Sequence, residues 1–235
     1  MCPVLRVPSC PRSVGSKVDG SEILPSGFLH AGGARFSMIK TLVLTGGIAS
    51  GKSTTLKYFR VRCPSWVFFD CDEVARRIVD RPAVLTALEE SLRVSLRNRQ
   101  GELDRAVLRS LVFEDPQKRL VLEELVHPLV RKELLEEREK VIHSSAATKF
   151  MADIPLYYEG NLSLAQDLTL VVGVSRLTQR ERLQNRNQFS EPLVDRILAA
   201  QLPLEEKVQS ANVVFWNEGS ITGLHSQVDL FLSQL

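Results

Sequence analysis

LTGGIASGKSTT, residues 44–55, is a glycine-rich stretch between a short apolar run and a helical pattern. It carries the complete pattern G-x-x-x-x-G-K-[ST], from Gly46 to Ser53. Glycine lets such a loop curl so that its N–H groups converge on an anion, and the following helix adds the positive end of its dipole. The pattern therefore predicts a loop that binds the phosphates of a nucleoside triphosphate. The alternative is a glycine-rich turn beside an ordinary surface lysine.

Several residues of this loop have an expected role toward ATP. Lys52 is expected to reach the β- and γ-phosphates, and the Ser53 hydroxyl to complete the coordination of Mg²⁺. No Asn-Lys-x-Asp guanine motif follows the fourth predicted strand, which argues against a GTPase. The predicted ATP-binding residues of the loop are Gly46, Gly47, Ile48, Ala49, Ser50, Gly51, Lys52, Ser53 and Thr54.

Five short apolar runs alternate with helical patterns along the chain. Such runs are typical of strands buried on both faces of a parallel sheet. The alternation predicts a doubly wound α/β fold of the P-loop NTPase type, in which ligands bind at the carboxyl ends of the strands. The predicted strands are 40–45, 66–70, 150–154, 168–174 and 212–216.

Apolar residues at helical spacing occupy most of the sequence between the predicted strands. The longest such region, 82–143, contains no predicted strand. The predicted helices are 50–62, 72–79, 106–113, 117–141, 176–186, 191–201, 203–211 and 221–235.

The composition is that of a globular protein, since 44% of the 235 residues are hydrophobic and 25% are charged. A net charge of +2 is too small to argue for binding to nucleic acid or to a membrane surface. No apolar run approaches the roughly 20 residues of a membrane-spanning helix. The four cysteines form no C-x-x-C pair and indicate free thiols in a reducing compartment. We expect a cytoplasmic protein that is a monomer or a weak oligomer.

Residues 1–37 differ in composition from the rest of the chain. Pro, Gly and Ser are dense there and no periodicity is sustained, so we expect a disordered leader. Met38 opens MIKTLVLTGG directly before the first predicted strand, and an upstream start codon is the simplest account of the leader. A transit peptide is the alternative, although Asp19 and Glu22 argue against it. The folded domain is expected to span 38–235.

Three aspartates lie where predicted strands end. Asp70 and Asp72, in FFDCDEVAR, face the same side if the second strand continues through both. A carboxylate at this edge can accept or orient the proton of an acceptor hydroxyl in phosphoryl transfer. Alternatively, Asp72 only N-caps the helix that follows. Asp153 ends the third strand among apolar residues, where an unpaired carboxylate is costly, so we expect it to lie beside a cation or a lysine.

Eight segments, in a fixed order from Met38 to about Asp229, resemble the dephospho-coenzyme A kinases. The combination of HPLVR, DIPL-x-x-E and Q-x-P-x-x-x-K…N-x-G is specific to this family among P-loop kinases. The resemblance implies transfer of the ATP γ-phosphate to the 3′-hydroxyl of dephospho-CoA, which gives CoA and ADP in the last step of coenzyme A biosynthesis. The segments are LTGGIASGKST, DCDEVARRIV, LDRAVLRSLVFEDP, LVHPLVR, DIPLYYE, QRERLQNR, RILAAQLPLEEK and ANVVFWNEG.

The resemblance also implies roles for residues on the acceptor side. Asp72 would be the base that binds the 3′-hydroxyl, within a helical acceptor-binding subdomain at about 72–148. His127 and Arg131 would line the acceptor site, and Asp153 would lie near both the acceptor and Mg²⁺. Glu159 would contact the acceptor. From the residues alone, His127 could instead end or kink a helix, because Pro128 follows it.

A helical lid at about 176–200 is implied in the same way. Arg182 and Arg186 would neutralise charge on the moving phosphoryl group. Arg182 would be one of the ATP-binding residues, and Arg186 would be a catalytic residue together with Lys52 and Asp72. The alternative is that this i, i+4 pair of arginines is a solvated helix face.

The sequence departs from the family pattern at a few positions, and other functions stay open. Ala49 stands where glycine is frequent, Tyr157 and Tyr158 where Leu-Phe is common, and Asn212 where aspartate is usual. One alternative is another P-loop kinase acting on a nucleotide, nucleoside or sugar acid. A second is a regulatory protein that binds ATP without transferring phosphate.

Overall fold

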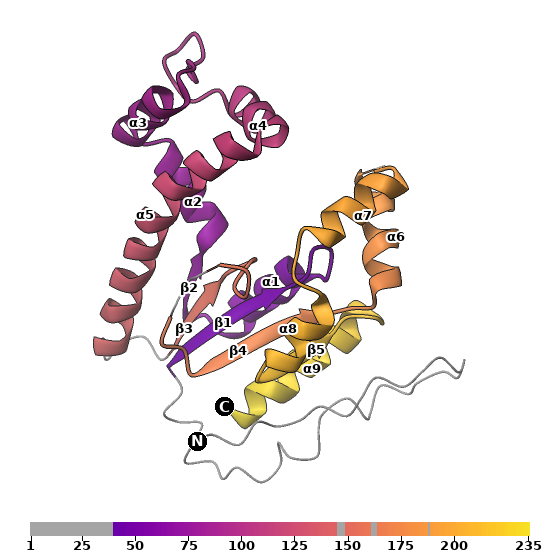
Figure 1. The fold of residues 1–235 in the computed structure, drawn as a ribbon. Helices are drawn as coiled ribbons and strands as arrows, with labels where there is room; N and C mark the ends of the chain where they lie inside the picture. Colours follow the sequence, from indigo (N-terminus) through magenta and orange to yellow (C-terminus); the bar gives the residue numbers. More distant parts are fainter. Residues whose placement is uncertain (1–39, 145–148, 161–163, 188) are drawn as a thin grey trace. The chain divides into compact units, whose positions relative to one another are not determined.

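The computed structural model describes residues 40–144, 149–160, 164–187 and 189–235, without the side chains of Arg186 and Asn187. The predicted leader at 1–37 lies outside the described residues. The chain divides into two compact units (Figure 1). The sheet unit holds the described residues up to 68 and from 149 onward, and the helical unit holds residues 69–144. Among these residues, no helix is long and apolar enough to cross a membrane.

Five strands form one sheet with the order β2-β3-β1-β4-β5. The pairs β1–β3, β1–β4 and β4–β5 are parallel, and at the edge the N–H of Val67 donates to the carbonyl of Lys149 at 3.0 Å. Each predicted strand is confirmed to within one residue at either end, as is the doubly wound fold class. The strands are β1 Thr41–Gly46, β2 Val67–Asp70, β3 Phe150–Asp153, β4 Leu168–Gly173 and β5 Val213–Trp216.

The central strand β1 sets the position of the glycine-rich loop. All six of its residues are buried, and it lies between β3 and β4. From β1 the chain continues through α1 (Lys52–Arg62) toward β2 at one edge, whereas β4 lies on the opposite side of β1. Where the chain connections from neighbouring strands run to opposite sides of the sheet, a crevice forms at the carboxyl ends of the strands, and such sheets bind ligands there.

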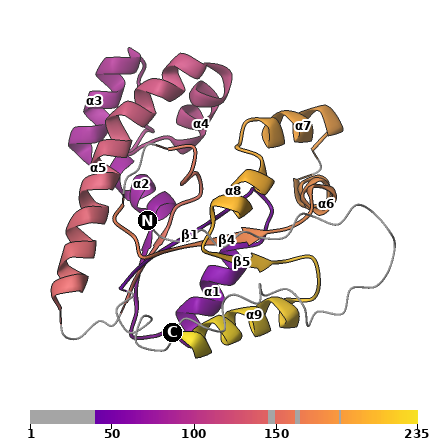
Figure 2. The same cartoon turned by 60° about the horizontal axis from the view of Figure 1, so that its bottom comes forward.

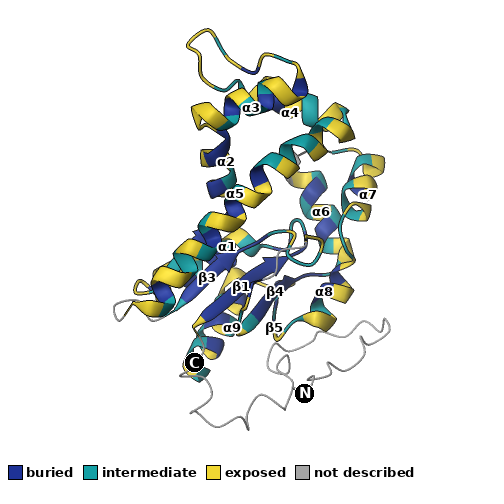
Figure 3. Cartoon of the chain, turned by 60° about the vertical axis from the view of Figure 1, so that its left-hand side comes forward, coloured by how far each residue is buried: buried dark blue, intermediate teal, exposed yellow. Residues whose placement is uncertain are grey.

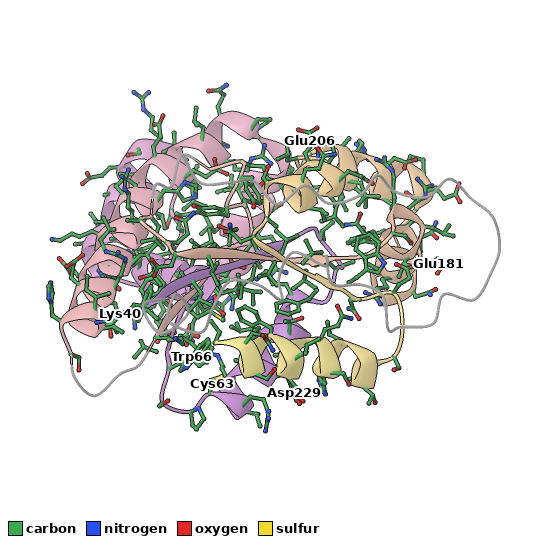
Figure 4. All side chains as sticks on the ribbon, turned by 90° about the horizontal axis from the view of Figure 1, so that it is seen from below. Lys40, Cys63, Trp66, Glu181, Glu206 and Asp229 are labelled. Atoms are coloured by element: carbon green, nitrogen blue, oxygen red, sulfur yellow. The ribbon has the colours of Figure 1, made fainter. Side chains whose placement is uncertain are left out.

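Helices cover both faces of the sheet (Figure 2). On one face, α1 packs against α9 (Ile221–Gln234), and the rings of Phe59, Phe215 and Phe231 lie 5.7–6.2 Å apart. Burying an aromatic side chain of this size contributes roughly 1.5–3 kcal/mol. On the other face, Leu204 of α8 (Leu204–Ser210) packs against β4. Figure 3 shows the strands and the inward faces of these helices buried, and Figure 4 shows Asp229 of α9 and Glu206 of α8 on opposite sides of the sheet.

Two further helices, α6 (Arg176–Asn187) and α7 (Glu191–Ala199), connect β4 to α8. They occupy the segment predicted as a lid. The helices predicted at 176–186, 191–201, 203–211 and 221–235 are all present, with bounds that shift by at most two residues.

The helical unit consists of α2 (Cys71–Val79), α3 (Pro82–Leu92), α4 (Arg105–Glu114) and α5 (Pro116–His143). The long helix α5 contacts the other three. Asp104 and Asp115 accept hydrogen bonds from the first N–H groups of α4 and α5, and so define where these helices begin. Leu88 and Leu134 are completely buried, which gives the unit a core of its own.

Candidate active site

The glycine-rich loop runs from the end of β1 to the first residue of α1. Two of its residues have left-handed backbone conformations, Ala49 at φ 59° and Gly51 at φ 96°. Glycine adopts such angles freely, whereas a residue with a Cβ pays about 1 kcal/mol. Glycine would therefore be the less costly residue at position 49. The loop closes on itself where the N–H of Ser50 donates to the carbonyl of Gly47 at 3.2 Å.

The glycine-rich loop leaves several of its N–H groups without a protein acceptor among the described residues. The N–H groups of Ala49, Gly51, Lys52 and Ser53 meet no acceptor within the described part of the chain. The last two begin α1, whose dipole places partial positive charge at the same point. Ser53 is exposed. The arrangement suits a phosphate group.

A lysine and a carboxylate meet beside the loop. Lys52 Nζ lies 2.5 Å from Asp153 Oδ1, at the end of β3. The two side chains are 15% and 5% exposed, so the ion pair is largely shielded from water. The buried carboxylate therefore lies beside a lysine, as its position in an apolar strand required. The pair also fixes Lys52 at the mouth of the loop.

Arg182 of α6 and Asn217, which follows β5, hold the loop through its carbonyl oxygens. Arg182 Nη1 donates to the carbonyl of Ala49 at 3.2 Å, and its Nη2 donates to the carbonyl of Asn217 at 2.8 Å. Asn217 Nδ2 donates to the carbonyl of Ser50 at 2.8 Å. A Cβ on Gly51 would collide with this amide, so the close contact requires glycine there. The predicted ATP residue Arg182 thus lies against the loop itself.

Two glutamines also contact the backbone of the loop. Gln179 Nε2 donates to the carbonyl of Ile48 at 2.8 Å, and the N–H of Ile48 donates to Gln201 Oε1 at 3.0 Å. Sequence reasoning missed the two glutamines and gave Asn217 no role beyond its place in the N-x-G motif. The signals were the segment QRERLQNR, which begins at Gln179, and the motifs Q-x-P-x-x-x-K and N-x-G, and none of them revealed the contacted atoms.

The start of α6 is fixed by a carboxylate from the same loop that carries Asn217. Glu218 accepts hydrogen bonds from the N–H and hydroxyl of Ser175, both at 2.7 Å, and from the hydroxyl of Thr178. Burial opposes ionisation of Glu218, but these hydrogen bonds and the charge of Arg182 outweigh it and lower the pKa of the carboxyl group. Residues 217 and 218 therefore support both the loop and the first turn of α6.

Glu159 forms an ion pair within the sheet unit. Its Oε1 is 2.6 Å from the Nζ of Lys207, whose side chain is completely buried, and it also accepts from the N–H of Leu202 at 3.0 Å. The segment after β3 is thus tied to the segment that leads into α8. Any contact between Glu159 and an acceptor would have to use the second carboxylate oxygen.

The structure corrects the expected conformation around Asp72. The strand does not continue through both aspartates, because β2 ends at Asp70 and α2 begins at Cys71. Asp70 is the N-cap, and its Oδ1 accepts from the N–H of Glu73 at 3.0 Å. The alternative that Asp72 caps the helix is therefore wrong as well. Asp72 is an exposed residue in the first turn of α2.

His127 and Arg131 lie one turn apart on α5, and both are exposed. Their helix does not end at Pro128, which lies inside it. The alternative that Pro128 ends the helix is therefore wrong. Tertiary contacts with α2, α3 and α4 support α5 and offset the hydrogen bond that proline removes.

Arg186 belongs to α6, but its side chain is outside the described part of the structure. The two tyrosines that depart from the family pattern contact each other, with their rings 5.3 Å apart. Burial raises the pKa of Tyr158 to about 12, so this phenol stays neutral at physiological pH. No group of three His, Cys, Asp or Glu side chains suited to a metal ion occurs within the described residues.

A doubly wound parallel sheet with this loop at the carboxyl end of its central strand defines a P-loop kinase fold. The family described as dephospho-CoA kinase (CoaE) matches residues 40–223. The chain belongs to this family.

Curated relatives agree with the family match, and solved structures share the fold. A dephospho-CoA kinase of Bacillus anthracis is 40% identical over 199 residues, which cover 84% of this chain and 98% of the relative. One of Enterococcus faecalis is 38% identical over the same shares. The crystal structure of TT1252 from Thermus thermophilus is 31% identical, with a TM-score of 0.66, and covers 84% of this chain and 98% of the other. The dephospho-CoA kinase of Campylobacter jejuni shares the fold, with a TM-score of 0.60, 23% identity and coverage of 83% and 97%.

Proposed function

We propose that this chain transfers the γ-phosphate of ATP to the 3′-hydroxyl of dephospho-CoA, giving CoA and ADP. The observation that carries this proposal is the family match over residues 40–223, which contain both the loop and the helical unit. Transfer to another small-molecule acceptor is not favoured, because the curated relatives over this span are dephospho-CoA kinases.

On the donor side, residues 46–54 would hold the phosphates of ATP. The converging N–H groups would bind phosphate oxygens, and Lys52 would carry its positive charge to the β- and γ-phosphates. Asp153 keeps the ammonium group at this position, so the positive charge is in place before the phosphates arrive. Arg182 would contact ATP from the lid segment, and Arg186 would neutralise charge on the transferred group.

Mg²⁺ fits the donor set beside the loop. The exposed hydroxyl of Ser53 and the carboxylate of Asp153 supply oxygen ligands, which this cation prefers, and phosphate and water oxygens would complete the shell. When bound, the ion would offset negative charge on the phosphates. Ser53 would be its direct protein ligand, and Asp153 would lie nearby.

On the acceptor side, Asp72 would accept the proton of the 3′-hydroxyl as that oxygen attacks phosphorus. Its exposure and its freedom from the capping role support this proposal, because Asp70 is the residue that caps α2. His127 and Arg131, adjacent on the exposed face of α5, would bind the acceptor together with Asp153 and Glu159. The helical unit would thus be the acceptor-binding subdomain, and α6 with α7 the lid.

The acceptor is tested by ADP release measured with ATP and four candidate acceptors. Dephospho-CoA should support turnover, whereas adenosine, AMP and gluconate should give rates no higher than ATP alone. ADP release that no acceptor stimulates would instead indicate a protein that binds ATP without transferring phosphate. Faster release with one of the other three acceptors would replace the proposed substrate.

The role of Asp72 is tested against a matched neighbour. Asp72→Asn should lower kcat at least 100-fold with an unchanged unfolding midpoint, because an amide cannot accept the proton. Asp70→Asn is the control, since asparagine caps a helix as well as aspartate does. This control should keep activity within about threefold. Near-normal turnover of Asp72→Asn would remove that residue from the mechanism.

We further propose a cytoplasmic protein that is a monomer or a weak oligomer and binds neither nucleic acid nor membranes. Its small net charge supports the absence of these partners. Light scattering across a range of protein concentrations measures the oligomeric state directly.

A further inference from the structure

The peptide groups of Ile48 in the glycine-rich loop are held by two side-chain amides that come from distant parts of the chain. The carbonyl of Ile48 accepts from Gln179 Nε2 at 2.8 Å, and its N–H donates to Gln201 Oε1 at 3.0 Å. The orientation of each amide is fixed by its partner, since a carbonyl needs a donor and an N–H needs an acceptor. A Cβ on Gly47 would lie 2.5 Å from Gln179 Nε2, so glycine permits this close approach.

The two glutamines stand at opposite ends of the α6–α7 segment. Gln179 is in the first turn of α6, is only 5% exposed, and donates its own N–H to the carbonyl of Ser175. Gln201 lies two residues beyond the end of α7, and the next N–H along the chain, that of Leu202, is held by Glu159. Both glutamines therefore lie in segments whose backbone is held by hydrogen bonds of its own.

The N–H of Ile48 donates to Gln201 and is therefore not available to a phosphate. These contacts thus act on the conformation of the loop and not directly on the ligand. The next residue, Ala49, has the left-handed φ of 59°, and Gly51 has φ 96°. Such a backbone persists only where surrounding contacts maintain it. Holding the peptides on both sides of Ile48 restricts the chain immediately before the strained residues.

We propose that Gln179 and Gln201 are positioning residues that keep the loop in its phosphate-binding conformation, each from one end of the lid segment. The inference rests on the proposed binding of ATP by this loop. It assigns Gln179 the role of donor and Gln201 the role of acceptor. The two roles are not interchangeable.

This difference provides the test, because glutamate can accept a hydrogen bond but its carboxylate cannot donate one. Gln201→Glu keeps the contact with the N–H of Ile48, whereas Gln179→Glu places a carboxylate against its carbonyl. Both variants add the same charge beside the same residue, so each controls for the electrostatic effect of the other. Gln179→Met and Gln201→Met remove the contacts without adding charge.

ATP affinity of the purified full chain is measured by calorimetric titration in the presence of Mg²⁺, and KM values for ATP and dephospho-CoA are measured separately. Both Met variants should weaken ATP binding about tenfold, which corresponds to the loss of one hydrogen bond and the exposure of its partner. Gln179→Glu should weaken it more than tenfold, and Gln201→Glu should stay within about threefold of wild type. KM for dephospho-CoA should change by less than twofold in every variant.

Equal losses in the two glutamate variants would overturn the proposal, as would wild-type affinity in Gln201→Met or equal changes in both KM values. If Gln179→Glu does not fold, the comparison of Gln201→Met with Gln201→Glu decides alone, because only the latter should restore binding. Failure of the wild-type chain to bind ATP would instead refute the proposed function.

Discussion

Removing the charge of Glu159 should destabilise the sheet unit far more than removing the charge of its partner. Lys207 is completely buried, and within the described residues its ammonium group meets no hydrogen-bond acceptor apart from this carboxylate, 2.6 Å away. Glu159 is 20% exposed and also accepts a hydrogen bond from the N–H of Leu202. Glu159→Gln retains that hydrogen bond but leaves a buried cation without a counter-charge.

Breaking a buried ion pair from one side costs about 3–5 kcal/mol, whereas replacing both partners by neutral groups is often close to neutral. Because Glu159 is partly exposed, we expect the lower limit, about 3 kcal/mol, for Glu159→Gln. A loss of that size lowers Tm by roughly 6–12 °C in a chain of this length. Lys207→Met should lower the unfolding free energy by about 1 kcal/mol, since the remaining carboxylate of Glu159 reaches water and still accepts a hydrogen bond from the N–H of Leu202. The double variant should be more stable than Glu159→Gln alone.

The assay is equilibrium unfolding in urea, followed by tryptophan fluorescence. The chain has two tryptophans, Trp66 and Trp216, and both belong to the sheet unit that contains the ion pair. Their signal therefore reports the unit in which the charge is removed. An unfolding free energy of Glu159→Gln within about 0.5 kcal/mol of wild type would refute the reasoning, as would a double variant less stable than that single one.

Three further predictions follow from individual contacts. Two arginines of the helical unit, at 77 and 81, outweigh the burial of Glu133 and lower its pKa below the ordinary 4.5. The stabilisation by this carboxylate is therefore present at neutral pH and is lost as pH falls below about 4.5. The difference in unfolding free energy between wild type and Glu133→Gln should shrink from pH 7 to pH 3. A difference that stays constant over this range would contradict the prediction. Gly51→Ala should weaken ATP binding in a titration and lower the unfolding free energy in urea by roughly 1–3 kcal/mol. The reason is that residue 51 has φ +96° and a Cβ there would collide with Asn217. An unchanged ATP affinity would contradict this prediction. The side-chain oxygen of Asn212 accepts from the N–H of Thr169 at 2.8 Å. The unfolding free energy of Asn212→Asp should therefore lie within about 0.5 kcal/mol of wild type, and that of Asn212→Leu should be about 1 kcal/mol lower. Equal unfolding free energies for the two variants would contradict this.

The last of these contacts accounts for one departure from the family pattern. The Asn212 amide supplies the carbonyl oxygen that accepts the N–H of Thr169, and an aspartate would supply a carboxylate oxygen in its place. The substitution therefore keeps the acceptor that ties the start of β5 to β4. Sequence comparison alone left this contact open, because it does not show which atom of the side chain is used.

The amino-acid sequence determined the features that depend on local pattern. Short apolar runs placed all five strands, and the spacing from Gly46 to Ser53 placed the loop, because a strand buried on both faces and a phosphate-binding turn each leave a continuous local signature. The cost of burying the carboxylate of Asp153 also required a cationic partner before any contact was known. Local pattern failed between Asp70 and Asp72, where strand and helix are equally compatible with two aspartates two positions apart.

Only the tertiary structure decided what holds the loop in place. Gln179, Gln201 and Asn217 meet the backbone of Ile48 and Ser50 across 131 to 167 positions of sequence. Backbone N–H and C=O groups are the same at every residue, so the partner of such a side chain has no signature in the sequence. The identity of these contacts is set by how β4, β5 and the helices after them pack around β1, and that packing depends on the whole chain.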